Sequence, residues 1–76
     1  MILELLDNLI LDVSMKTSKF NHNDYEFEIP LIEKDKFNDE LYEYYESKNK
    51  PETVYNYNGI DVIYDESFTE IRLVKK

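Results

Sequence analysis

The sequence predicts an α+β domain of two layers, in which two helices cover one face of a mainly antiparallel sheet in the order α-β-α-β-β-β. Three observations predict this class. Apolar residues recur with helical spacing in residues 2–13, apolar and acidic residues alternate in residues 24–29, and an Asn-Gly pair joins two runs rich in tyrosine and β-branched residues. The 76 residues contain no internal repeat or composition break, so residues 1–76 are expected to form a single domain.

The first helix is predicted over residues 2–13, where the apolar side chains share one face and the acidic side chains lie opposite. The alternative is a strand over residues 9–15, because apolar residues also alternate there and Leu11 fits the helical face poorly. The longer helical pattern favours the helix. Residues 16–24, which follow, are polar and rich in turn-forming residues, and they predict a connector.

The first strand is predicted over residues 24–29. Its aromatic and aliphatic side chains fall on one face, whereas Glu26 and Glu28 fall on the other. This alternation indicates a sheet with one buried and one acidic face. Pro30 has no N–H to donate to a strand ladder, so it is expected at a strand end or a sheet edge.

The second helix is predicted from Asp35, as its N-cap, to about Lys48, because Pro51 prevents its continuation. Its outer face carries Asp39, Glu43 and Glu46, with Glu40 and Tyr42 beside them. Tyr42 has no apolar companions on that side. It is therefore either an ordinary surface tyrosine or an aromatic anchor within a charged interface.

The pair Asn58-Gly59 predicts a β-hairpin between residues 53–57 and 60–64, because a type I′ turn requires positive φ at both central residues. A last strand, over about residues 69–75, is expected to complete the sheet. Its apolar side chains point inward, and its charged side chains point outward.

The hairpin register places Tyr55, Tyr57 and Tyr64 on one face. We expect this face to pack in the core, because so small a domain has few other large side chains to fill it. The opposite face, which includes Asn56, Asp61 and Asp65, then extends the acidic surface. The alternative is a ladder of exposed tyrosines.

The charge of the chain is strongly negative, at −8, and it is unevenly distributed. Residues 24–46 hold nine acidic residues against two lysines, a net charge of −7. Such a field repels the phosphates of nucleic acids and anionic lipid headgroups, and it speeds encounter with a basic partner. We therefore expect no direct binding to DNA, RNA or membranes, and a basic protein as partner. The alternative is that the charge serves solubility alone.

The N-terminal apolar run, residues 1–11, carries two acidic residues and is too short to span a bilayer. It lacks the basic region and the cleavage site of a signal peptide. These features predict a cytoplasmic protein.

Residues typical of catalysis are scarce. The chain has no cysteine, His22 is its single histidine and Gly59 its single glycine, so zinc-thiolate sites, catalytic triads and glycine-rich phosphate loops are not expected. Residues 56–61 match the spacing of a calcium-binding loop only superficially, and they lie in the predicted hairpin. We expect no enzymatic activity, no catalytic residue, no metal site and no cofactor.

The remaining features predict a small acidic inhibitor that binds a basic nucleic-acid-binding site on another protein and thereby mimics DNA. In size, acidity, lack of cysteine and tyrosine-rich α+β layout the chain resembles small acidic phage inhibitors, including anti-CRISPR proteins. This resemblance of overall character implies a nuclease complex as partner and the host cytoplasm as location. The predicted partner-binding residues are Asp39, Glu40, Tyr42, Glu43, Glu46, Glu26, Glu28, Asn56, Asp61 and Asp65.

Two other classes of protein fit the same sequence. An antitoxin or immunity protein that neutralises a basic toxin would show the same surface charge. A structural or regulatory interaction module is the third class. In that third class the first helix is a candidate dimer seam. The chain is expected to be a monomer or a homodimer.

Overall fold

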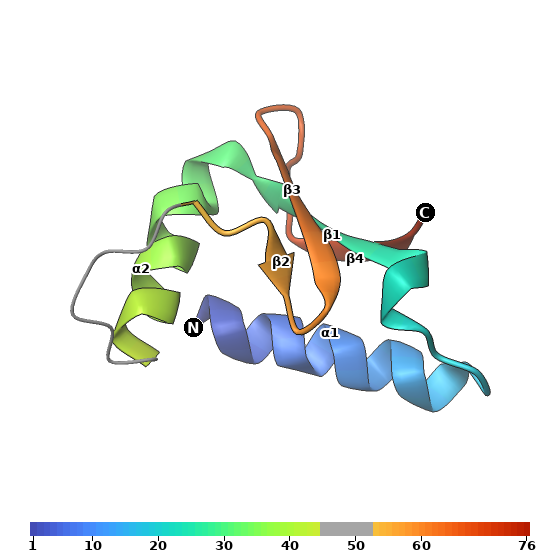
Figure 1. Ribbon diagram of the computed structural model, residues 1–76. Coiled ribbons are helices and arrows are strands. Elements are labelled where there is room, and N and C mark those ends of the chain that lie inside the picture. Colours follow the sequence, from blue (N-terminus) through green and yellow to red (C-terminus); the bar gives the residue numbers. More distant parts are fainter. Residues whose placement is uncertain (45–52) are drawn as a thin grey trace.

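The computed structural model describes residues 1–44 and 53–76 of the protein (Figure 1). The helices and strands follow one another as α1 (Ile2–Lys16), β1 (Tyr25–Pro30), α2 (Lys34–Tyr44), β2 (Asn56–Tyr57), β3 (Ile60–Asp65) and β4 (Arg72–Lys75). Short 3-10 turns, His22–Asp24 and Leu31–Glu33, precede β1 and α2. The order α-β-α-β-β-β and the α+β class are as predicted.

The described strands form one mixed sheet in the order β2-β3-β1-β4. The outer pairs, β2 with β3 and β1 with β4, are antiparallel, as expected. The central pair is parallel, with Phe27 beside Val62. The parallel pairing follows from the path of the chain, because β2 runs antiparallel to β3 and carries the chain back along the sheet before β3 begins.

Helix α1 confirms the helical interpretation of the N-terminal segment and extends beyond the predicted end, to Lys16. Its inner face buries Ile2, Leu3 and Leu6. Leu11, which fits the helical face poorly, is 57% exposed. The helix therefore buries apolar residues that recur with helical spacing and leaves Leu11, which does not fit that spacing, on its surface.

Helix α2 begins at Lys34, two residues before the start expected with Asp35 as N-cap. The 3-10 turn after Pro30 leads directly into Lys34, so Asp35 lies in the first turn of the helix and is not its N-cap. An acidic side chain at this place still interacts favourably with the helix dipole. Pro30 ends β1, as expected for a residue without an N–H. The predicted continuation of the helix to Lys48 lies outside the described residues.

The hairpin turn has the predicted geometry, with φ of 53° at Asn58 and 84° at Gly59. Positive φ at two successive residues defines the type I′ turn and explains why glycine occupies the second position. Tyr57 pairs with Ile60, as the two-residue turn requires. Strand β2 is short, and β4 covers only the second half of the segment predicted as a strand.

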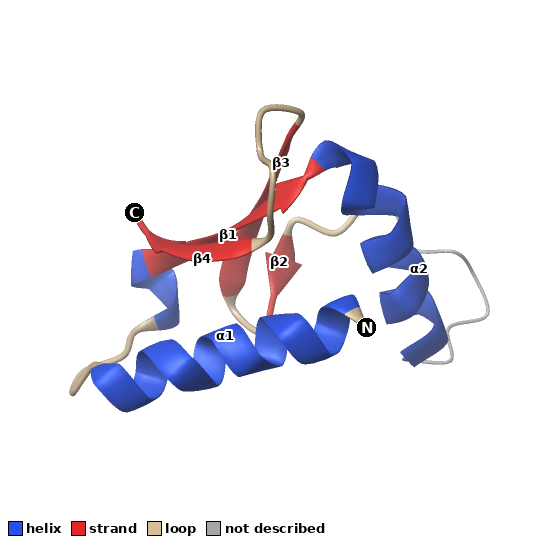
Figure 2. Cartoon of the chain, turned by 180° about the vertical axis from the view of Figure 1, so that it is seen from behind, coloured by secondary structure: helices blue, strands red, loops and turns tan. Residues whose placement is uncertain are grey.

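The core lies between the inner face of the sheet and the two helices. Its fully buried side chains come from α1, β1, α2 and β3, and they are Leu6, Phe27, Ile29, Phe37 and Ile60. Figure 2 shows α1 running along one side of the sheet and α2 beyond β2. This arrangement confirms the two-layer architecture.

The hairpin tyrosines divide between the core and the surface. Tyr57 is buried and packs edge to face against both Phe27 and Phe37, and its hydroxyl donates to Asp7 of α1 at 2.7 Å. Tyr64 is half-buried, whereas Tyr55 is 63% exposed. The predicted core position is therefore confirmed for Tyr57 and wrong for Tyr55, which lies outside β2, whose first residue is Asn56.

Candidate functional site

The face of the sheet opposite the helices carries several of the predicted partner-binding residues. Glu26 and Glu28 alternate with the buried Phe27 and Ile29 and therefore point away from the core. The strand register brings Asp61 beside Glu26 on one side and beside Asn56 on the other. Asp65 lies at the end of the same face, opposite Pro30. The structure thus gathers Glu26, Glu28, Asn56, Asp61 and Asp65 on one surface.

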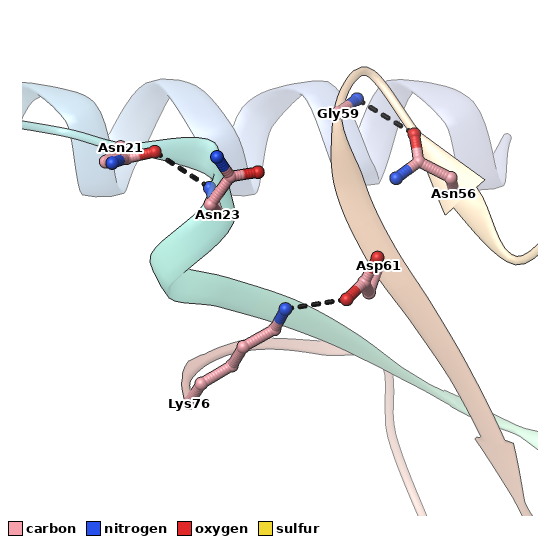
Figure 3. A network of polar contacts seen from close by, with 6 residues as sticks. All are labelled: Asn21, Asn23, Asn56, Gly59, Asp61 and Lys76. Atoms are coloured by element: carbon pink, nitrogen blue, oxygen red, sulfur yellow. Dashed lines mark hydrogen bonds and ion pairs between the residues drawn. The ribbon is translucent and has the colours of Figure 1, made fainter.

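Two basic residues near the C-terminus compensate part of this negative charge. Nη2 of Arg72 lies 3.0 Å from Oε1 of Glu28, and Nζ of Lys76 lies 2.6 Å from Oδ2 of Asp61 (Figure 3). The hydrogen bond and positive charge of Lys76 hold the pKa of Asp61 below its ordinary value, while the hydrogen bond to Asp61 raises the pKa of Lys76. Both shifts favour the charged forms, so the pair is intact at neutral pH.

Two residues of this surface also stabilise turns. The Asn56 side chain accepts a hydrogen bond from the N–H of Gly59 at 3.1 Å, which supports the hairpin turn (Figure 3). The Asp65 carboxylate accepts one from the N–H of Ser67 at 2.8 Å, and this hydrogen bond lowers the pKa of Asp65. Asn and Asp side chains commonly form such local turns. The presence of these residues is therefore partly explained by the fold.

A second surface is formed by the outer face of α2. Asp35, Asp39 and Glu43 are all exposed, and their spacing of four residues places them on one side of the helix. Tyr42 is half-buried beside them. Glu46, the remaining residue predicted for this face, lies outside the described residues. The predicted partner-binding residues thus occupy two surfaces, one on the sheet and one on α2.

Glu40 has a structural role that the sequence did not indicate. Its Oε1 atom accepts a hydrogen bond from the N–H of Ile2 at 2.7 Å, and the N–H of Leu3 lies 3.5 Å away. These donors belong to the first turn of α1, whose N–H groups have no partners within the helix. A carboxylate at a helix N-terminus also interacts favourably with the helix dipole. Glu40 therefore caps α1 from the neighbouring helix, whereas Asp39 and Glu43 are exposed.

Asn38 is a buried polar residue that the sequence interpretation overlooked. Its amide nitrogen donates to the carbonyl of Lys34 at 2.7 Å and to the hydroxyl of Tyr64 at 3.3 Å, and its amide oxygen accepts from the N–H of Val54 at 2.8 Å. The Tyr64 hydroxyl in turn donates to the carbonyl of Val54 at 2.5 Å. Burial raises the pKa of Tyr64, so the phenol stays protonated and able to donate.

This network connects α2 to the segment that leads into the hairpin. Little in the sequence indicates that Asn38 is buried, because asparagine in a helix is usually exposed. Its partners lie up to 26 residues away in the chain.

Within residues 1–44 and 53–76, no three histidine, aspartate or glutamate side chains are grouped closely enough to hold a metal ion. Neither described helix combines the length and the apolar character needed to cross a membrane.

Comparison of the chain with protein families, with curated proteins and with solved structures found no match. The features of the molecule that bear on function are the two acidic surfaces and the basic side chains that pair with part of their charge.

Proposed function

We propose that the protein is a non-catalytic inhibitor that binds a basic, nucleic-acid-binding surface of another protein. The observation that carries this proposal is the exposed acidic face of α2, with Asp35, Asp39 and Glu43 on one side of the helix. This face belongs to the segment of the chain with a net charge of −7. A concentrated negative field of this kind accelerates encounter with a basic surface.

The face of α2 is the better candidate of the two acidic surfaces, because Asp35, Asp39 and Glu43 form one exposed row along a helix. On the sheet, Arg72 and Lys76 engage Glu28 and Asp61. A partner that used those carboxylates would first have to displace the two basic side chains. The carboxylates of the sheet then act as a supporting field, and those of α2 make the direct contacts.

The spacing of the α2 carboxylates limits what they can imitate. One helical turn separates them by about 5–6 Å, whereas the phosphates of one DNA strand follow one another at about 3.4 Å along the axis. The helix therefore resembles a few phosphates and does not copy a whole duplex. We infer that it occupies a small group of arginines and lysines within the partner's groove. Tyr42, half-buried beside this face, is placed to act as an aromatic anchor.

Affinity capture from cell lysate, followed by mass spectrometry, tests the proposal and identifies the partner. We expect a nucleic-acid-binding protein that is captured by the wild-type chain and lost with the charge-reversed variant described below. Capture of a basic toxin would instead assign the chain to the antitoxin or immunity class. Capture of an acidic or uncharged partner, retained by that variant, would contradict the proposal.

Reversing both charges in an Asp39→Lys/Glu43→Lys variant should slow association with the captured partner by about tenfold or more at low ionic strength. It should also flatten the dependence of the association rate on salt, because fewer charges are then screened. Stopped-flow or surface plasmon resonance measurements over a salt series check both effects.

The matched control is a Glu66→Lys/Glu70→Lys variant, which changes the net charge equally at two exposed positions between β3 and β4. It should retain most of the association rate. Equal slowing by the two variants would show that only the net charge matters and would remove the special role of α2.

A further inference from the structure

We propose that the open edge of β3 binds an extended, acidic peptide segment of a partner protein. This docking site lies apart from the acidic face of α2 and is independent of the proposed inhibitory contact. Three features define the occupant. They are unpaired backbone groups along β3, an apolar hollow beside them and one lysine at its border.

The first feature is an edge of β3 that β2 leaves uncovered. Strand β3 continues to Asp65, whereas β2 pairs with Ile60 and Asp61 alone (Figure 1). Beyond β2, the N–H of Val62 donates a hydrogen bond to the carbonyl of Tyr55 at 2.9 Å. Backbone groups two residues apart point to the same edge, so those of Tyr64 face the same way. Among the described residues, no strand pairs with Tyr64 there.

The open edge results from the buried network around Asn38. In a longer hairpin the segment before Tyr55 would continue alongside β3. Instead, the Asn38 side chain accepts a hydrogen bond from the N–H of Val54, and the Tyr64 hydroxyl donates one to the carbonyl of Val54. With Tyr55 opposite Val62, Thr53 is the residue that would face Tyr64 in a longer hairpin, and these hydrogen bonds hold the chain before Tyr55 towards α2. The same interactions that stabilise the fold thus keep the edge available.

The second feature is a hollow of about 350 Å³ at this edge, lined by Leu31, Lys34, Tyr55, Val62, Ile63 and Tyr64. Five of these six side chains are apolar or aromatic. Tyr55 and Tyr64 meet edge to face, with ring centroids 5.9 Å apart. Leu31 and Ile63 are 45% and 40% exposed, which is unusual for aliphatic side chains that share one depression. Such a lining fits an apolar side chain next to a paired backbone.

The third feature is Lys34, the single charged residue of the lining. Its ammonium group lies 5.9 Å from the ring centroid of Tyr64, and none of the ion pairs among the described residues includes it. A carboxylate on the bound peptide would complement this charge. A second copy of this chain is a poorer occupant, because it would bring a net charge of −8 against this chain, whereas a short segment brings the one carboxylate that Lys34 can neutralise.

The test uses two fluorescein-labelled pentapeptides, TVEVT and TVKVT, and measures their binding to the full chain by fluorescence anisotropy. We expect saturable binding of the acidic peptide and weaker binding of the basic one. Lys34→Glu should lower the affinity for the acidic peptide by about tenfold and raise the affinity for the basic one. This variant should fold, because a glutamate in the first turn of a helix is favourable. The matched control, Lys36→Glu, alters an exposed lysine outside the hollow and should change binding by less than about twofold.

A version of the acidic peptide with N-methylated backbone amides tests the pairing itself and should lose binding, because it cannot complete a strand ladder. Several results would overturn the proposal. These are acidic peptide binding that does not saturate, equal losses in the two lysine variants, and unchanged binding of the N-methylated peptide. Self-association that the peptide does not reverse would show instead that a second copy occupies the edge.

Discussion

Replacing Asn38 with leucine should lower the free energy of unfolding by about 2 kcal/mol or more, because it leaves the N–H of Val54 and a hydroxyl contact of Tyr64 unsatisfied inside the protein. Each buried group without a partner costs about 1–3 kcal/mol. For a domain of this size, each kcal/mol lowers the melting temperature by about 4–8 °C. Thermal unfolding followed by circular dichroism should therefore show a decrease of about 10 °C or more.

The matched control is Lys36→Leu, which adds the same side chain at an exposed position of α2. It should leave the melting temperature nearly unchanged. If the Asn38→Leu variant has the same melting temperature as the wild type, the buried network makes no net contribution to stability, because apolar packing of the leucine then compensates for its loss. The explanation given for the open edge of β3 would then also lose its support.

Replacing Glu40 with alanine should destabilise the protein by about 1–2 kcal/mol, because the first N–H groups of α1 lose their acceptor. Glu40→Gln keeps an acceptor oxygen at the same position, so it should destabilise the protein less than Glu40→Ala does. Chemical denaturation with urea measures both changes. Since Glu40 belongs to the acidic segment, this variant also separates a charge that supports the fold from charges available to a partner.

Glu43→Ala provides the comparison, because Glu43 lies on the same helix and is exposed. It should change stability by only a few tenths of a kcal/mol, as surface substitutions usually do. Equal losses of stability for Glu40→Ala and Glu43→Ala would argue against the capping role. A stable Glu40→Ala protein that fails to bind the partner would place Glu40 at the interface, as the sequence alone had suggested.

Local patterns in the sequence predicted most of the secondary structure. The helical periodicity of residues 2–13, the alternation before Pro30 and the pair Asn58-Gly59 each depend on neighbours in the chain, and each corresponds to an element of the structure. These patterns are informative because helices and tight turns are stabilised by interactions over a few residues. The start of α2 was misplaced by two residues, since the 3-10 turn after Pro30 has no clear signal of its own.

Interactions between distant residues could not be predicted in this way. The parallel pairing of β1 with β3 depends on how the chain returns after α2. The cap of α1 by Glu40 joins residues 38 positions apart, and the ion pair of Glu28 with Arg72 joins residues 44 positions apart. Composition identified the acidic surface but did not distinguish carboxylates engaged in the fold from exposed ones. The contact predicted on α2 stays a prediction, and the structure assigns to Glu40 the cap of α1.

Competition between this protein and nucleic acid for the captured partner tests the central claim most directly. The partner is saturated with a labelled nucleic acid that it binds, and the wild-type chain is titrated into the complex. We expect displacement that is complete near equimolar protein, with the Asp39→Lys/Glu43→Lys variant ineffective at the same concentration. A ternary complex of partner, nucleic acid and this protein, with no displacement, would contradict the claim that the acidic face of α2 occupies the nucleic-acid-binding surface.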